Sequence, residues 1–194
     1  MLEQPLPELS ADRLDYNIQG AYFQQFLTLK EARQLFCDLV YKKGRWILPN
    51  RDLALKLARF SLYMTETCWG SALNSLTSRW LADAIIQGCE TGAISWQEFH
   101  FGIDQEIWDR LSASKDPLIQ ERMQMLSCPI RYFRFVSPPQ AKLIIPFKCR
   151  GIDPWVKEGD KIERLSSMDS AFREAFQKTK KQSLEGWSVE QLNQ

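Results

Sequence analysis

The chain has 194 residues, a length that suits one domain or two small ones. Apolar residues make up 44% of the chain and charged residues 25%, and 25 Lys and Arg side chains against 24 Asp and Glu side chains leave a formal net charge of +1. This composition excludes a wholly disordered chain, and the neutral balance excludes an overall electrostatic attraction to nucleic acid or to an anionic membrane.

Apolar residues at helical spacing dominate the first half of the chain. Ser10 stands where an N-cap would precede the first helix, and Thr28 and Glu31 form a capping box, in which side chain and backbone satisfy each other's hydrogen bonds. We predict, in chain order, a helix at about 10–25, a second from 28 to near 44, an extended connector or single edge strand at 45–50, a third helix from 52, and a fourth, set off from the third at Gly70, that ends between 88 and 92.

Shorter helices and then a change of period mark the second half. Another capping box, Ser95 with Glu98, and the pair Asp116-Pro117 each predict a helix start. We predict, in chain order, short helices after 95, 104 and 116, an antiparallel hairpin with strands at 130–136 and 142–149, a final helix at about 170–182, and a frayed polar tail beyond 186. The predicted fold is therefore mainly α with a small antiparallel β-hairpin appendage.

Few side chains are available for chemistry. His100 is the one histidine of the sequence, which excludes a site with two histidine ligands, and no glycine-rich phosphate-binding motif occurs. The five cysteines are widely spaced with no C-x-x-C pair, so we expect free thiols in a reducing cytoplasm. No apolar stretch reaches the roughly 18 residues of a membrane span, so we expect a cytoplasmic protein with no membrane partner.

One segment at the start of the first predicted helix stands apart. Asp12 and Asp15, three residues apart, and Tyr16, four residues after Asp12, lie within one helix face, where they could meet a metal and a ring system together. The plainer interpretation is that Asp12 stabilises the first turn through the helix dipole while Asp15 pairs with Arg13 or with a neighbouring helix. Helix physics alone favours the plainer interpretation.

The hexapeptide at 11–16, Ala-Asp-Arg-Leu-Asp-Tyr, resembles the A-D-R-[LIM]-D-Y segment of HD-superfamily phosphohydrolases, metal-dependent helical enzymes that cleave phosphate from nucleotides and related esters. Segments at 21–23, 92–98, 104–117 and 150–154 are similar to the downstream half of the same proteins. The resemblance implies that 1–129 is the downstream helical part of an HD phosphohydrolase. The remainder, 130–194, would be the hairpin with the C-terminal helix packed on it, all in one continuous domain.

The resemblance also implies roles for three residues. The family holds its metal with a histidine, a His-Asp dipeptide and a final aspartate, and Asp12 matches that aspartate. Tyr16 matches a residue that lines the substrate pocket, and Asp15 is implied as a supporting hydrogen-bond acceptor at the substrate. The chain departs from the family at Gln19-Gly20, where Arg-Asp is usual, and it contains no His-Asp dipeptide.

A single monodentate aspartate holds a divalent cation weakly. We therefore expect the isolated chain to be inactive and to hold no cofactor. A divalent metal (Mn, Mg, Fe or Ni) is expected only if a partner chain, the complementary N-terminal HD half, supplies the other ligands. A homo-oligomer is left open.

Two alternatives to this split phosphohydrolase remain. One is a catalytically inactive HD-like module for binding or interaction. The other is binding of nucleic acid or nucleotide phosphates by the basic hairpin, which is the less favoured because such a hairpin also arises when one face packs and the other is solvated. The candidate phosphate contacts are Arg131, Arg134, Lys148 and Arg150.

Overall fold

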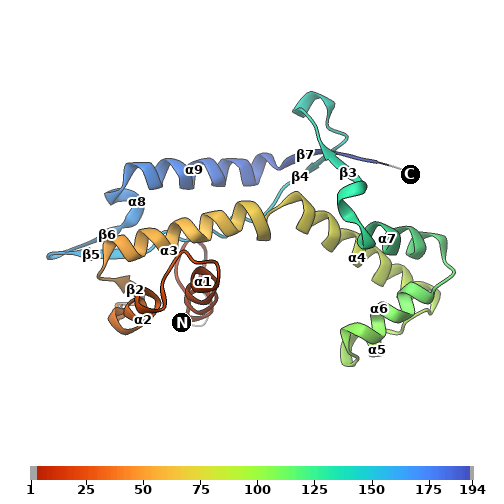
Figure 1. Cartoon of the computed structure of the whole chain (residues 1–194), viewed down its shortest axis with the longest axis horizontal. Helices are drawn as coiled ribbons and strands as arrows, with labels where there is room; N and C mark the ends of the chain where they lie inside the picture. Colours follow the sequence, from red (N-terminus) through yellow and green to blue (C-terminus); the bar gives the residue numbers. More distant parts are fainter. Residues whose placement is uncertain (1–3, 193–194) are drawn as a thin grey trace. The chain divides into compact units, whose positions relative to one another are not determined.

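The computed structural model describes residues 4–192 and is mainly helical, which confirms the predicted fold class (Figure 1). The α-helices are, in chain order, α1 (Ala11–Phe23), α2 (Leu29–Asp38), α3 (Arg51–Met64), α4 (Ala72–Thr91), α5 (Trp96–Phe101), α6 (Asp104–Ala113), α7 (Pro117–Ser127), α8 (Leu165–Met168) and α9 (Ser170–Glu185). The strands are β1 (Val40–Lys42), β2 (Arg45–Leu48), β3 (Phe133–Phe135), β4 (Leu143–Ile145), β5 (Trp155–Glu158), β6 (Lys161–Arg164) and β7 (Trp187–Gln191). The remaining helical elements are a π-helix, η1 (Thr65–Trp69), and two 3-10 helices, η2 (Pro129–Arg131) and η3 (Pro138–Gln140).

Two compact units make up the described chain, and each combines two separate stretches of sequence. The first unit contains the described residues up to Gly70 together with Pro146–Glu185, and the second contains Ser71–Ile145 together with the described residues from Gly186 onward. The expectation of one continuous domain, with parts at 1–129 and 130–194, stays a prediction. None of the helices within residues 4–192 is both long enough and apolar enough to cross a membrane.

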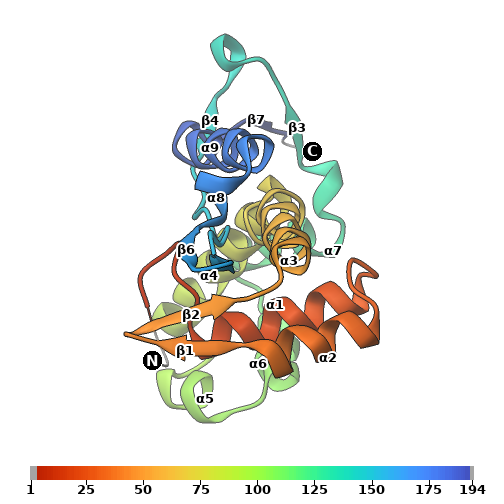
Figure 2. The ribbon, with the colours of Figure 1, turned by 90° about the vertical axis from the view of Figure 1, so that its left-hand side faces the viewer.

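The first unit packs its helices around a four-stranded sheet of order β1-β2-β5-β6. Strand β2 pairs antiparallel with β1 and parallel with β5, where Ile47 lies opposite Trp155. Helices α1 and α2 lie side by side, and both also contact α3 (Figure 2). Large side chains that this unit buries completely come from helices, strands and the segment before β5, and include Leu35, Leu48, Leu57, Phe60, Ile152, Val156 and Phe172. Burial of such side chains is the main term that holds the unit together.

Residues 45–50 contain the predicted extended structure, but the edge position is wrong. Strand β2 is interior, because β1 flanks it on one side and β5 on the other. The second helix ends at Asp38 and not near Gly44, because Lys43 and Gly44 adopt positive φ angles of 51° and 78°, the geometry of a two-residue hairpin turn. This turn folds β1 back onto β2 and consumes the residues that were assigned to the helix.

The second unit contains α4 to α7 and a three-stranded sheet of order β3-β7-β4. Helices α4 and α7 form its main helical contact. One apolar cluster lies between α4, α6 and α7, and another joins α4 and α7 to the sheet. Glycine at 88 permits the close approach of α6, because a Cβ atom there would lie 2.8 Å from a methyl group of Leu111.

The predicted hairpin is wrong in its pairing. Strands β3 and β4 do not bond to each other, because β7 lies between them and pairs antiparallel with both. Val189 is opposite Phe135 on one side and Leu143 on the other, and it is completely buried. The segment predicted as a frayed tail is therefore the central strand. Its alternation directs Val189 into the core, while Glu190 pairs with Arg134 of β3 and with Lys142, the residue just before β4.

Both predicted capping boxes are present, and the one at Glu31 makes a pH-dependent contribution to stability. A hydrogen bond from Lys56 and two from Thr28 hold the pKa of Glu31 at about 2, against an ordinary value of 4.5. Because the folded-state pKa is the lower one, this contribution is fully present above about pH 4.5 and is lost as the pH falls toward 2. We expect Glu31→Gln to flatten the dependence of the urea unfolding midpoint on pH in that window.

The control for this measurement is Glu174→Gln, because Glu174 is an exposed glutamate on α9. Its midpoint should follow the wild-type curve between pH 2 and 5. A Glu31→Gln curve that runs parallel to the wild-type curve would contradict the assignment.

Candidate functional site

Helix α1 carries the three residues of the candidate site, and its burial pattern sets their directions. Ser10 accepts a hydrogen bond from the backbone N–H of Arg13 and so caps the helix as predicted. The helix buries Leu14, Asn17, Ile18 and Ala21, while Asp12 and Asp15 are exposed. The carboxylate of Asp12 in the first turn is therefore open to a ligand or to a partner.

Tyr16 is the point at which distant parts of the first unit converge. Its ring is half-buried and meets the ring of Trp69 edge-on, with 5.3 Å between the centroids. Burial raises the pKa of the Tyr16 hydroxyl, the cations of Arg13 and Arg150 oppose this, and the carboxylate of Asp12 adds to it. The phenol thus stays protonated at neutral pH, and Asp12 and Arg150 lie within electrostatic range of it.

Trp69, which forms one wall beside Tyr16, belongs to the π-helix η1 at the end of α3. Such π-helical turns are rare in proteins, and those that occur often lie at functional sites. Next to it, Gly70 lets Phe147 approach closely, since a Cβ atom at residue 70 would lie 2.3 Å from that ring and 2.5 Å from the carbonyl oxygen of Thr65. The π-helix thereby places an aromatic wall beside the α1 face, which the sequence did not indicate.

The contacts of Asp15 and Arg13 differ from the expected ion pair between them. Asp15 accepts a hydrogen bond from the side chain of Gln19 at 2.7 Å. Arg13 does not pair with Asp15 but donates to the backbone carbonyl oxygens of Gln4 and Glu8, at 2.6 and 2.8 Å. Arg13 therefore ties the N-terminal segment to α1, and Asp15 remains on the exposed surface of the helix.

The candidate phosphate contacts fall into different units. Arg131 and Arg134 belong to the second unit, whereas Lys148 and Arg150 lie in the first, both exposed. Arg134 donates two hydrogen bonds to Glu190, whose other oxygen lies 2.9 Å from Lys142, and these cations lower the pKa of Glu190. Of these four cations, Arg150 is the one whose charge acts to lower the pKa of Tyr16.

The imidazole, thiol and carboxylate side chains of the described residues are the groups that could bind a metal. Within residues 4–192, no group of three or more His, Cys, Asp and Glu side chains lies close enough together to hold an ion. His100 is exposed on α5, which belongs to the second unit, whereas Asp12 belongs to the first.

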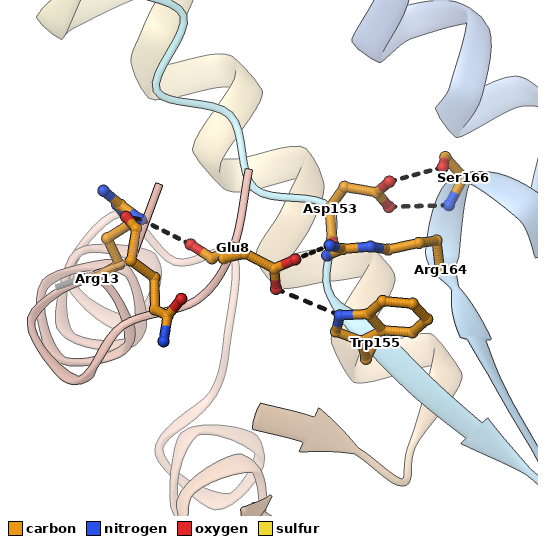
Figure 3. Close-up of polar contacts among 7 residues, drawn as sticks. Glu8, Arg13, Asp153, Trp155, Arg164 and Ser166 are labelled. Carbon is orange, nitrogen blue, oxygen red and sulfur yellow. Dashed lines mark hydrogen bonds and ion pairs between the residues drawn. The ribbon is translucent and has the colours of Figure 1, made fainter. Parts of the chain in front are cut away.

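A cluster of polar contacts fixes the start of α1 to the sheet (Figure 3). Glu8 lies two residues before the N-cap, and its carbonyl oxygen accepts from Arg13. Its carboxylate pairs with Arg164 of β6 and accepts from the indole N–H of Trp155 of β5 at 3.2 Å. These contacts hold the helix that carries Asp12 against strands β5 and β6, which come much later in the sequence.

The same cluster continues beyond Glu8. Arg164 also donates to the backbone carbonyl of Asp153, whose carboxylate accepts from the backbone N–H and the hydroxyl of Ser166 at 3.0 and 2.6 Å (Figure 3). The guanidinium groups of Arg164 and Arg45 each lie 4.2 Å from the ring centroid of Trp155. Sequence reasoning missed this cluster, because its members are far apart in the chain and form no local motif.

Comparisons with known proteins agree with this fold. No protein-family model matches the chain. The chain is 29% identical over 190 residues to the uncharacterized protein YdhJ of Bacillus subtilis, an alignment that covers 93% of this chain and 56% of that protein. The crystal structure of a phosphohydrolase from Bacteroides thetaiotaomicron is similar with a TM-score of 0.54 and 12% identity, over 82% of this chain and 56% of that one. The chain therefore has a phosphohydrolase-like fold and spans about half the length of both relatives.

Proposed function

We propose that this chain is the C-terminal half of a split HD-type phosphohydrolase that acts on nucleotides or related phosphate esters and is completed in trans. The complementary N-terminal half would bring the histidine and the His-Asp pair that this sequence lacks. The observation that supports the proposal is that Asp12 and Tyr16 lie four residues apart on α1, and that the charges of Asp12 and Arg150 both act on the pKa of the Tyr16 hydroxyl.

Each of these three residues suits a phosphate ester. Asp12 offers an exposed carboxylate, the kind of oxygen ligand that hard divalent cations prefer. Such a cation, when bound, polarises a phosphoryl oxygen and activates water. Arg150 offers a cation for the phosphate, and the protonated hydroxyl of Tyr16 can donate a hydrogen bond to a substrate oxygen. The rings of Tyr16 and Trp69 supply an aromatic surface for a sugar or a base.

A second candidate, the inactive HD-like module, is favoured by the surroundings of Gly20. A Cβ atom at this position would lie 2.8 Å from the ring of Phe60, so the space beside α1 that a larger side chain would enter is filled by an aromatic ring. The binding of nucleic acid by the second unit is not favoured, because Arg134 and Lys142 are both paired with Glu190.

The decisive experiment is an assay of the reconstituted protein. The complementary half is taken as the part of the Bacillus relative that this chain does not span, expressed as a separate polypeptide. We expect Mn²⁺-dependent release of phosphate from a nucleotide panel when the halves are mixed. We expect Asp12→Asn to reduce that activity by more than about a hundredfold, because a metal ligand is lost. Asp52→Asn, which changes an exposed carboxylate in the first turn of α3, is the matched control.

Binding of Mn²⁺, followed by electron paramagnetic resonance, gives a readout that does not depend on turnover. The mixture should bind the ion and the isolated chain should not. Equally weak binding with and without the complementary half would contradict completion in trans. Activity of the isolated chain that Asp12→Asn removes would show that the chain holds a full ligand set by itself.

A further inference from the structure

A cavity of about 270 Å³, here called the α4–α7 cavity, lies within the second unit and is lined by α4, α7 and the three-stranded sheet. Its apolar lining consists of Leu76 and Trp80 of α4, which are buried, and Leu143 of β4. Sites for small molecules usually begin at a volume of roughly 300 Å³ and combine an apolar lining with a few polar groups. The cavity therefore suits a small ligand, and its polar groups select the kind of ligand.

The charged side chains at the α4–α7 cavity are mostly cationic. Among the described residues that line it, one carboxylate, that of Asp83, stands against the cations of Arg79, Arg122 and Lys142. Arg79 belongs to α4, Arg122 belongs to α7, and Lys142 precedes β4. The fold, and not a local run of basic residues, brings these cations to one cavity.

Two of these cations are also partners in ion pairs. Arg122 donates from Nε to Asp83 at 3.1 Å and pairs through Nη1 with Glu121. Lys142 lies 2.9 Å from Glu190. These contacts hold both cations at the cavity and leave donors available, because a guanidinium and an ammonium have more N–H groups than these bonds use.

Arg79 is the cation that its neighbours do not neutralise. Its side chain is exposed, and within residues 4–192 it makes no hydrogen bond or ion pair. Asp83 lies four residues later on the same face of α4, but its carboxylate already accepts from Arg122. The cavity thus combines one free guanidinium with N–H donors that are held in place around it.

We propose that the α4–α7 cavity binds a small organic oxyanion, which is a molecule with a carboxylate or phosphate group on an apolar body. Arg79 makes the main charged contact, because the parallel N–H groups of a guanidinium bind two oxygens of either oxyanion at once. The remaining N–H groups of Arg122 and Lys142 donate to the same group, and the side chains of Leu76 and Trp80 contact the apolar body.

This site differs from the phosphate contacts that a nucleic acid would need. A nucleic-acid strand is bound by many free cations along its backbone, whereas one small oxyanion needs a single free cation with donors around it. The proposal also goes beyond the proposed function, because it concerns the second unit and uses none of Asp12, Tyr16 and Arg150.

The test uses benzoate and phenyl phosphate, which present the two oxyanions on the same phenyl body. Calorimetric titration of the full chain at low ionic strength should show saturable binding of at least one of them, and the tighter ligand identifies the preferred oxyanion. Benzamide, a neutral molecule of the same shape as benzoate, should not bind. Because the attraction is electrostatic, added sodium chloride should raise the dissociation constant.

Arg79→Gln should raise the dissociation constant at least about tenfold, because it removes the free cation. Arg79→Lys keeps the charge and should recover part of that loss. Lys115→Gln is the matched control, because Lys115 is an exposed cation of the same unit outside the cavity lining, and it should leave the constant unchanged. Since both residues are exposed, all three variants should keep the wild-type circular dichroism spectrum.

Trp80 reports where the ligand binds. A ligand in the α4–α7 cavity should change the tryptophan fluorescence, and Trp80→Phe should remove that change while calorimetry still detects binding. Three results would each overturn the proposal: no saturable binding of either oxyanion, equal effects of Arg79→Gln and Lys115→Gln, or a fluorescence change that is the same in Trp80→Phe as in the wild-type chain.

Discussion

Replacement of Arg164 by alanine is expected to lower the free energy of unfolding by about 2–4 kcal/mol. The guanidinium is only 20% exposed and joins three groups, namely the carboxylate of Glu8, the carbonyl of Asp153 and the ring of Trp155. Its removal leaves the carboxylate of Glu8, itself 26% exposed, without its cation. The loss of one partner of such an ion pair is costly, because the remaining charge stays partly desolvated.

Urea unfolding followed by tryptophan fluorescence measures this effect, since Trp155 lies in the cluster itself. The matched control is Arg173→Ala, an exposed arginine on α9 in the same unit, which should change the free energy by less than about 0.5 kcal/mol. Glu8→Gln should cost less than Arg164→Ala, because the amide oxygen can still accept from Trp155. Equal effects of Arg164→Ala and Arg173→Ala would contradict the role of the cluster.

The features that the sequence predicted well are those fixed by neighbours in the chain. The capping box of Thr28 with Glu31 depends on atoms three residues apart, as does that of Ser95 with Glu98, and both are present in the structure. Asp116 likewise caps α7 with Pro117 at its first position. Within one turn of helix, side-chain chemistry alone decides where the helix begins.

The features that were missed depend on pairing between distant segments. Strand β7 is short and polar at alternate positions, and its sequence alone resembles a frayed terminus. It becomes a central strand only because β3 and β4, more than 40 residues earlier, both offer it an open edge. Strand β2 was placed at an edge for the same reason, since its parallel partner β5 follows more than 100 residues later. No local periodicity carries that information.

The residues of the candidate site also fall into a group that local sequence predicted and a group that depends on distant segments. Asp12, Asp15 and Tyr16 were found because they lie on one helix within five residues. The coupling of Arg150 and Trp69 to Tyr16 could not be found, because it depends on how the π-helix and the segment before β5 fold against α1. The sequence predicted the helix of the candidate site, and the structure adds the ring of Trp69 and the charge of Arg150 beside Tyr16.

Replacement of Gly20 by aspartate, the residue usual at this place in HD phosphohydrolases, is expected to lower the free energy of unfolding by about 2–5 kcal/mol. A Cβ atom at residue 20 would lie 2.8 Å from Cζ of Phe60, a completely buried side chain that also meets Phe26 edge-on in the core. The new carboxylate would be pressed against an aromatic ring, which offers it no hydrogen bond. Gly20→Ala should cost less, because the gain in helix propensity of about 1 kcal/mol offsets part of the clash.

A double-mutant cycle with Phe60→Leu tests whether the ring is the cause. Phe60→Leu alone removes core volume and should destabilise the chain, yet the combination with Gly20→Asp should cost at least about 1 kcal/mol less than the sum of the two single changes. Strict additivity in urea unfolding would show that Gly20 is not coupled to Phe60. A non-additive result would show that a carboxylate at residue 20 requires a smaller side chain at residue 60. An aspartate introduced at residue 20 alone would then destabilise the helix that carries Asp12.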